Sequence, residues 1–293
     1  MQKNLLRSAR PWRDGASLPL PALPLLSILL LAMLLGSGAV SAQVPNTPPS
    51  FTGFPITLAG EGNLEYSQPV AADLGTLAGG TAGYLEIVFG TKQGDLHVIH
   101  RNTNGTWAEA PGFPVNVGTY IASSPAVGDL TGDGVPEIVV GHGNHNVNGG
   151  GGPGGVKAFR NNGSLLWARS SFDYVTGQDG QPDAVFGTPA IGDVDGDGQN
   201  EVAWGGFDFR IHLVSGANGS YEPGWPLFIR DTVWSSPALH DIDGDGEKDI
   251  IIGVDAHDEP GFGTQNGGSL HVLRYDASQT CSTANPESCT MPT

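Results

Sequence analysis

The chain has 293 residues, with 30 acidic residues against 13 basic ones and a formal net charge of −17. A surface this acidic repels the phosphates of nucleic acids and of anionic membranes, so neither is expected as a partner. Glycine contributes 45 residues, about twice its usual share, and few segments have helical periodicity. Composition therefore indicates an all-β chain rich in turns.

The N-terminus is predicted to be a secretory signal peptide. Several basic residues precede an apolar run from about Leu18 to Val40, and small residues lead to Ala42. This order is typical of exported chains and places cleavage near Ala42. The run is close to membrane-spanning length, so an uncleaved anchor is the alternative. We expect a secreted, periplasmic or cell-surface protein that is not inserted in the membrane after cleavage.

The rest of the chain divides into a linker, a repeat region and a tail. The linker covers residues 43–50, and the tail covers residues 279–293 and holds Cys281 and Cys289, for which an exported location favours a disulfide. Between them we predict four repeated units, at about residues 51–112, 113–171, 172–224 and 225–278.

Each unit repeats three short segments in a fixed order. The first segment contains a proline followed by Ala or Val, and it recurs at residues 66–71, 122–127, 186–191 and 234–239. The second is an acid, three apolar or aromatic residues and glycine, at residues 86–90, 137–141, 201–205 and 249–253. The third is an apolar run at residues 96–99, 156–159, 211–214 and 270–273. Three to four short strands per unit, without helices, predict the blades of a β-propeller.

An acidic loop joins the first two segments in the last three units. Oxygen-bearing side chains stand at loop positions 1, 3, 5 and 9, and glycine at position 6 permits a tight turn. Odd-numbered side chains of such a turn converge on one point, and Ca²⁺ takes six to eight oxygen ligands. We predict three Ca²⁺ sites, with side-chain ligands Asp129, Thr131, Asp133 and Glu137; Asp193, Asp195, Asp197 and Glu201; and Asp241, Asp243, Asp245 and Asp249. The backbone carbonyls of Val135, Gln199 and Glu247 are predicted to complete them.

Two alternatives bear on these loops. An EF-hand requires a glutamate at position 12 and a helix after the loop, whereas position 12 here is Val140, Trp204 or Ile252 inside a strand-like run, which excludes it. Acidic surface turns without an ion remain the second alternative. The loop between Asp73 and Glu86 in the first unit is longer and has no further carboxylate, so we expect no ion there.

The fixed order of proline segment, cation loop and acid-apolar-glycine segment resembles the FG-GAP repeat, or VCBS-type repeat, of integrin-α-like β-propellers, over nearly all of residues 51–275. The resemblance implies a Ca²⁺-stabilised propeller for extracellular recognition or adhesion, with a protein or a glycan as its ligand. Such blades also occur in polysaccharide-degrading enzymes, so a carbohydrate-active enzyme, a polysaccharide lyase or hydrolase, is the alternative. No catalytic motif such as Gly-x-Ser-x-Gly or His-Glu-x-x-His occurs after Ala42, which favours the binding module.

The four units are fewer than such propellers usually have, so a partial or truncated ring is one reading. The other is a closed ring. The last unit ends after its third segment, and Phe51-Thr52-Gly53-Phe54-Pro55 resembles the Gly-Phe-Pro and Gly-Trp-Pro endings of other units. The closed-ring reading predicts that this N-terminal segment supplies the missing outer strand of the last unit.

The ligand is expected on the rim opposite the cation loops. Antiparallel strands send the loops after the first and second segments to opposite rims, and two loops after the second segment are enlarged, at residues 142–155 and 254–269. Tyr66, Phe186 and Trp234 share one position near this rim. They suit packing between blades or a sugar-stacking platform.

Other polar residues have competing interpretations. His142 and His145 suit a transition-metal site or a plain glycine-rich loop, and the acids around Asp255 suit glycoside cleavage or a solvated loop. His97, His212 and His271 recur at one position of the third segment, which predicts a packing role.

Overall fold

The computed structural model describes residues 51–58, 60, 64, 66–77, 80–144, 153–173, 181–229, 231–256 and 267–278. The predicted signal peptide, the linker, both cysteines, His145 and residues 257–266 lie outside these ranges. The described strands all lie within one compact unit, Thr52–Thr293. Every regular element among the described residues is a strand, and no helix there is long and apolar enough to cross a membrane.

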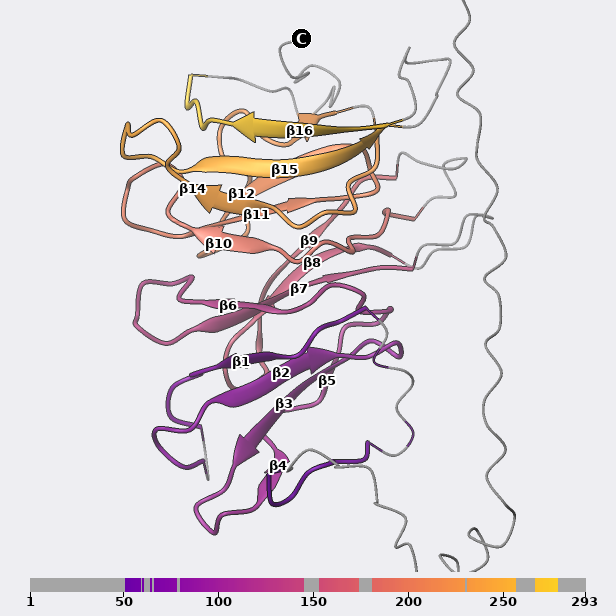
Figure 1. The fold of residues 1–293 in the computed structure, drawn as a ribbon, viewed down its shortest axis with the longest axis vertical. Helices are drawn as coiled ribbons and strands as arrows, with labels where there is room; N and C mark the ends of the chain where they lie inside the picture. Colours follow the sequence, from indigo (N-terminus) through magenta and orange to yellow (C-terminus); the bar gives the residue numbers. More distant parts are fainter. Residues whose placement is uncertain are drawn as a thin grey trace, which may run out of the picture. The chain divides into compact units, whose positions relative to one another are not determined.

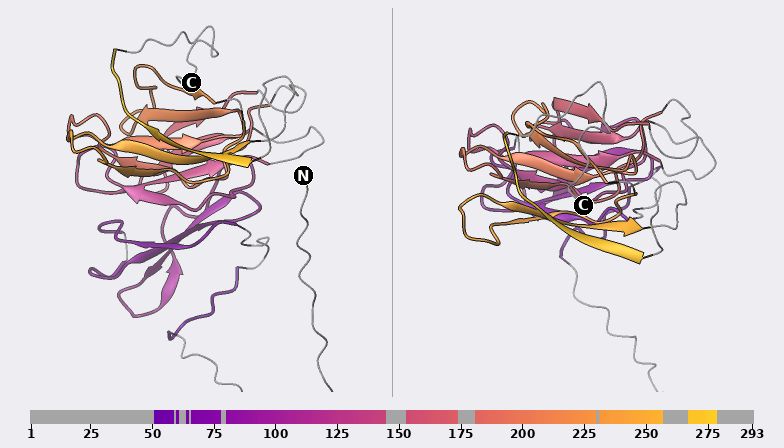
Figure 2. Two further views of the ribbon diagram at one scale, coloured as in Figure 1. Left: turned by 45° about the horizontal axis from the view of Figure 1, so that its top comes forward. Right: turned by 90° about the horizontal axis from the view of Figure 1, so that it is seen from above.

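Four antiparallel sheets follow one another along the chain (Figures 1 and 2). The first contains β1 (Val70–Ala72), β2 (Glu86–Gly90), β3 (Asp95–Arg101) and β4 (Trp107–Glu109), with β5 (Val115–Asn116) also pairing with β3. The second contains β6 (Ala126–Gly128), β7 (Glu137–His142), β8 (Gly155–Phe159) and β9 (Leu165–Ser170). The third contains β10 (Ala190–Gly192), β11 (Glu201–Gly205), β12 (Arg210–Ser215) and β13 (Leu227–Phe228). The fourth contains β14 (Ala238–His240), β15 (Asp249–Ala256) and β16 (Gly267–Leu273). The all-β prediction with four repeated units is confirmed.

The four sheets share one strand register. In each, the last residue of the first strand pairs with the acid that opens the second strand, as in Gly192↔Glu201 and His240↔Asp249. The first strands are shorter than predicted, because each begins only after its proline. Proline lacks the N–H that a ladder hydrogen bond requires, so the residues up to it form a lead-in.

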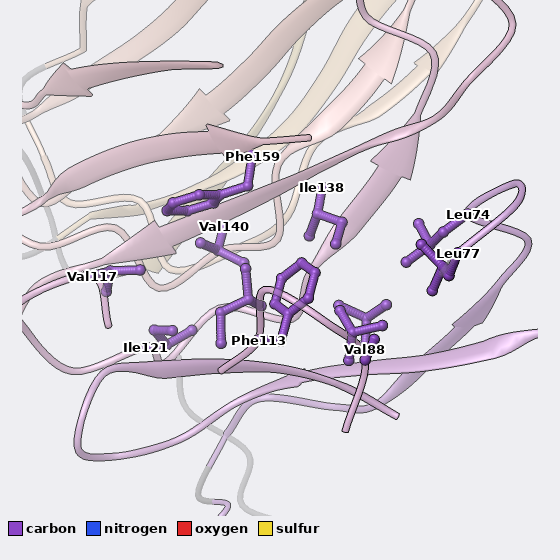
Figure 3. Close-up of a cluster of buried hydrophobic side chains, with 12 residues drawn as sticks. Leu74, Leu77, Val88, Phe113, Val117, Ile121, Ile138, Val140 and Phe159 are labelled. Atoms are coloured by element: carbon purple, nitrogen blue, oxygen red, sulfur yellow. The ribbon is translucent and has the colours of Figure 1, made fainter. Parts of the chain in front are cut away.

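The hydrophobic core lies between consecutive sheets. Figure 3 shows the first of these layers, in which Val88, Ile121 and Phe113 of the first unit and its connection face Ile138 and Val140 of β7. The two later layers pair β8 with β11 and β12 with β15 in the same way. The apolar residues of the third strand in each of the first three sheets are therefore covered by the second strand of the next sheet.

The structure corrects the predicted ring closure. Phe54 lies in no strand and packs edge-on against Trp107 of β4, with ring centroids 5.3 Å apart. The fourth sheet has three strands among the described residues. An aromatic partner within its own unit holds the Phe54 segment at the first sheet, so it does not serve as the outer strand of the last.

Candidate functional site

The three acidic loops share one backbone conformation. Glycines at loop positions 4 and 6 have positive φ, between 74° and 98°, which L side chains rarely adopt. The aspartate at position 1 accepts the N–H groups of both glycines. We number the loops by their units, so the second, third and fourth loops begin at Asp129, Asp193 and Asp241. In the third loop Asp193 accepts from Gly196 at 2.8 Å and from Gly198 at 3.1 Å. The same pairs form at Asp129 with Gly132 and Gly134, and at Asp241 with Gly244 and Gly246. The first aspartate thus folds the loop around its own carboxylate.

The acid at position 9 closes the loop from the other side. Glu201 accepts the N–H of Val194 at 2.7 Å, and Glu137 and Asp249 make the same bond at 2.9 Å to the residue at position 2. Glu86 makes it too, to Leu74 at 2.9 Å, in the loop that lacks further carboxylates. Closing the loop is therefore a structural role of this acid, independent of any ion. Sequence reasoning assigned it only a ligand role, although the recurrence of an acid at Glu86 was the available signal.

The structure brings the acids together in two of the three loops. Ligand atoms of Asp193, Asp195 and Asp197 lie within 4.8 Å of one another, and so do those of Asp241, Asp243 and Asp249. Glu201 and Asp245 are outside these groups, and the described residues of the second loop form no group of three acids. The aspartate at position 5 also accepts the N–H of the residue at position 7 in all three loops, at Asp133–Val135, Asp197–Gln199 and Asp245–Glu247.

The electrostatics of the loops fit a cation. Burial raises the pKa of Glu201 to about 7, with added repulsion from Asp195 and Glu222. Burial also raises the pKa of Glu137. At Asp129 burial opposes ionisation, but the N–H groups of Gly134, Gly132 and Thr131 outweigh it and lower its pKa. The donor set consists of oxygen atoms alone, which suits a hard divalent cation such as Ca²⁺ rather than a soft one.

The loop of the fourth unit differs from that of the third by an ion pair to its carboxylates. Arg274, just beyond β16, forms an ion pair with Asp243, and its Nε lies 3.6 Å from Asp245. The equivalent residue beside the third loop is Ser215, at the end of β12. Arg274 therefore partly neutralises the carboxylates of the fourth unit's loop, whereas Lys248 at the third unit's loop donates to the backbone carbonyl of Asp193.

Neighbouring loops are linked through the residue at position 8. The side chain of Asn200 donates to the carbonyl of Asp129 at 2.7 Å, and Lys248 donates to the carbonyl of Asp193 at 3.1 Å. Each link joins position 8 of one loop to position 1 of the loop before it. The loops therefore support one another along the series of sheets.

The three shared aromatic residues converge at the opposite ends of the strands. The rings of Tyr66 and Phe186 are 6.4 Å apart, and those of Phe186 and Trp234 are 5.8 Å apart. They line a pocket of about 520 Å³, to which Lys92 and Tyr120 also contribute. Tyr66 is 73% exposed and Trp234 is 48% exposed.

Lys92 and Tyr120 were missed by sequence reasoning. The second unit has Ala122 at the shared aromatic position, and Tyr120 supplies the ring from two residues earlier, 6.0 Å from Phe186. Lys92 lies 5.8 Å from the centre of the Tyr120 ring. Tyr66 itself has a φ of 67°, an unusual conformation for a bulky residue and one that concentrates at functional sites.

The histidines have structural roles. His142 is 5% exposed and bonds to Thr119 Oγ1 at 3.1 Å. His212 is fully buried, stacks on Trp204 at 4.7 Å and bonds to Asp208 at 3.0 Å. The predicted packing role is confirmed for His212 and for His97, which is 2% exposed and bonds to Glu109 at 2.9 Å.

Comparison with known proteins agrees with the repeats. The family described as FG-GAP-like repeat matches residues 82–140 and 193–252. No curated protein matches the chain. Among solved structures, the Pseudomonas aeruginosa PilY1 C-terminal domain is similar with a TM-score of 0.51 and 16% identity, over 78% of this chain and 51% of that one. The Vibrio cholerae biofilm matrix protein Bap1 gives a TM-score of 0.45 and 20% identity, over 70% of this chain and 26% of that one. The chain thus spans about half of one and a quarter of the other, and the likeness to the PilY1 domain concerns the fold alone.

Proposed function

Since this chain is built from FG-GAP-like repeats, we propose that it is an exported, Ca²⁺-binding module for extracellular recognition or adhesion. The observation that carries the proposal is that the acidic loops and the aromatic residues lie at opposite ends of the strands. The acidic loops follow the first strands of the last three sheets, whereas Tyr66, Phe186 and Trp234 precede the first strands of their sheets. One end suits a cation and the other suits a ligand.

Ca²⁺ has a structural role in this proposal. The side chains at positions 1, 3, 5 and 9 would hold it, and the cation would neutralise carboxylates that otherwise repel one another. Because Asn200 and Lys248 join each loop to the one before, a fixed loop also steadies its neighbour. The ion does not touch the ligand, which binds at the far ends of the strands.

The chemistry of the pocket favours a glycan as the ligand. Exposed rings of Tyr66 and Trp234 offer flat apolar faces of the kind that sugar rings stack on. The hydroxyl groups of Ser124, Thr188 and Ser236 lie around the same pocket and can exchange hydrogen bonds with sugar hydroxyls. Few of the lining side chains carry charge, which suits a neutral polysaccharide.

A glycan array probed with the mature chain in Ca²⁺ tests this function. We expect binding to neutral glycans that Trp234→Ala weakens about tenfold. Leu165→Ala, which removes an equally exposed apolar side chain outside the pocket, is the matched control and should bind like the parent. Binding that neither Trp234→Ala nor Tyr66→Ala changes would contradict the pocket assignment. Depolymerisation of a bound polysaccharide would favour the carbohydrate-active enzyme instead.

A further inference from the structure

The outer face of the fourth sheet exposes two positions that are buried in every other sheet. The third strands of the first three sheets carry pairs of apolar residues that are all 0% exposed: Leu96 and Val98, Val156 and Ala158, Ile211 and Leu213. The equivalent pair in β16 is Leu270, 73% exposed, and Val272, 51% exposed. Sequence pattern alone would bury them.

A glycine in each second strand shows what covers this face elsewhere. A Cβ on Gly90 would lie 2.3 Å from Ile121, which precedes the first strand of the next sheet and packs against this glycine. We call this packing position the seat. The same contact is 2.7 Å between Gly141 and Val185, and 2.2 Å between Gly205 and Val233. Gly253 is the equivalent glycine of β15, and among the described residues a Cβ there would meet only Ser235, at 3.5 Å.

The uncovered face is hollow as well as apolar. A pocket of about 680 Å³ opens over Gly253 and Leu270, with Ser235 and Val254 also lining it. Cross-strand pairing puts Val272 opposite Ile251 on the same side of the sheet. In Figure 1, β16 is the last strand of the series, beyond β15. The seat that Ile121, Val185 or Val233 fills in the other sheets is thus present here.

We propose that this face docks a further FG-GAP-like unit, supplied from outside residues 52–278. Its Val or Ile before the first strand would seat over Gly253, and its second strand would cover Leu270 and Val272. Three interfaces within this chain already use that arrangement. The proposal does not rest on the Ca²⁺ or glycan assignments above, although Trp234 lines both pockets.

A second copy of the chain is a poorer occupant. Its first unit carries Glu65 at the seating position, next to Tyr66, where the other units carry Ile or Val. A carboxylate would then enter an apolar seat at a large desolvation cost. Phe89 and Ile99 of the first sheet are moreover 6% and 3% exposed, so that sheet has little apolar surface left to offer.

Adding one unit to the whole chain tests the seat. Arg274 of the fourth unit corresponds to Ser215 of the third. A second copy of residues 216–278 is therefore joined directly after Arg274. This copy supplies an outer strand for the fourth unit and then a fifth unit with its own Val233. We expect the amides of β16 to exchange more slowly in the extended chain. Gly253→Ala should leave the Tm of the original chain unchanged but lower that of the extended chain by roughly 5 °C, because the added Cβ then meets the new valine.

Gly205→Ala is the matched control, and it should lower the Tm of both chains because its seat is filled in both. Equal effects of Gly253→Ala in the two chains, or β16 amides that exchange as fast as before, would overturn the proposal. So would a dimer of the original chain, detected by sedimentation, that Gly253→Ala dissociates, because it would assign the face to a second copy.

Discussion

The carboxylate of Glu201 accepts a hydrogen bond of 2.7 Å from the backbone N–H of Val194, seven residues earlier. Glu86 makes the same bond in a loop without further carboxylates. The acid therefore closes the turn, which requires an acceptor, and the proposed function gives it a second role in binding a cation, which requires a charge. Substitution can separate these two roles.

Substituting glutamine for Glu201 and for Glu86 distinguishes turn closure from cation binding. The glutamine side-chain oxygen can still accept the N–H bond, so Glu201→Gln should fold normally but reduce the rise in Tm that Ca²⁺ produces. Glu86→Gln removes a charge from a loop expected to hold no ion, and it serves as the control, with a Ca²⁺-dependent rise equal to that of the parent. Differential scanning calorimetry with and without Ca²⁺ measures both. Equal rises in the two variants would show that Glu201 is not a ligand.

Arg274 should weaken the fourth loop as a cation site. Its guanidinium pairs with Asp243 at the protein surface, and binding of Ca²⁺ has to displace it. Arg274→Gln is expected to raise the affinity of this loop by about two- to fivefold, the size of an exposed ion pair. Calorimetric titration resolves the change. Unchanged affinity would indicate that Arg274 leaves the carboxylates accessible.

The two ends of the strands should respond to separate substitutions. Asp193→Ala removes a carboxylate that also accepts two loop N–H groups, so it should lower Tm and the Ca²⁺-dependent rise together. Trp234→Ala should leave that rise intact and weaken glycan binding. A Trp234→Ala variant that loses the rise would contradict the assignment of ion and ligand to opposite ends.

His142 makes stability depend on pH. Burial, with help from the charge of Lys157, lowers the pKa of His142 from 6.5 to about 4. Between pH 6.5 and 4 the unfolded chain therefore binds a proton at this histidine while the folded chain does not. The contribution of His142 to the free energy of unfolding should fall over that window by up to about 3 kcal/mol. In chelator, the Tm of His142→Gln should decline less steeply than that of the parent, and parallel declines would refute this.

The repeated strands were predictable because their signals are local. An acid, three apolar residues and glycine specify β2, β7, β11 and β15. In the first three of these strands, the glycine marks the point where a residue before the next sheet packs closely. The loops were predictable for the same reason, because the turn depends on glycines a few residues from the aspartates.

The features that sequence reasoning missed depend on contacts between units. Nothing near Phe54 indicates that Trp107, more than 50 residues away, is its partner. Leu270 and Val272 match buried pairs elsewhere, and they are exposed because no sheet among the described residues covers them. Tyr120 takes a place in the pocket that the repeat pattern assigned to Ala122.

The stoichiometry of Ca²⁺ bound to the mature chain, measured by isothermal titration calorimetry, tests the central claim most directly. We predict three ions per chain, one in each of the loops that begin at Asp129, Asp193 and Asp241. If each affinity is near 10⁻⁴ M, about 1 mM Ca²⁺ should stabilise the fold by roughly 1.4 kcal/mol per site. A chain that binds no Ca²⁺, and whose Tm is the same in Ca²⁺ and in chelator, would contradict the account.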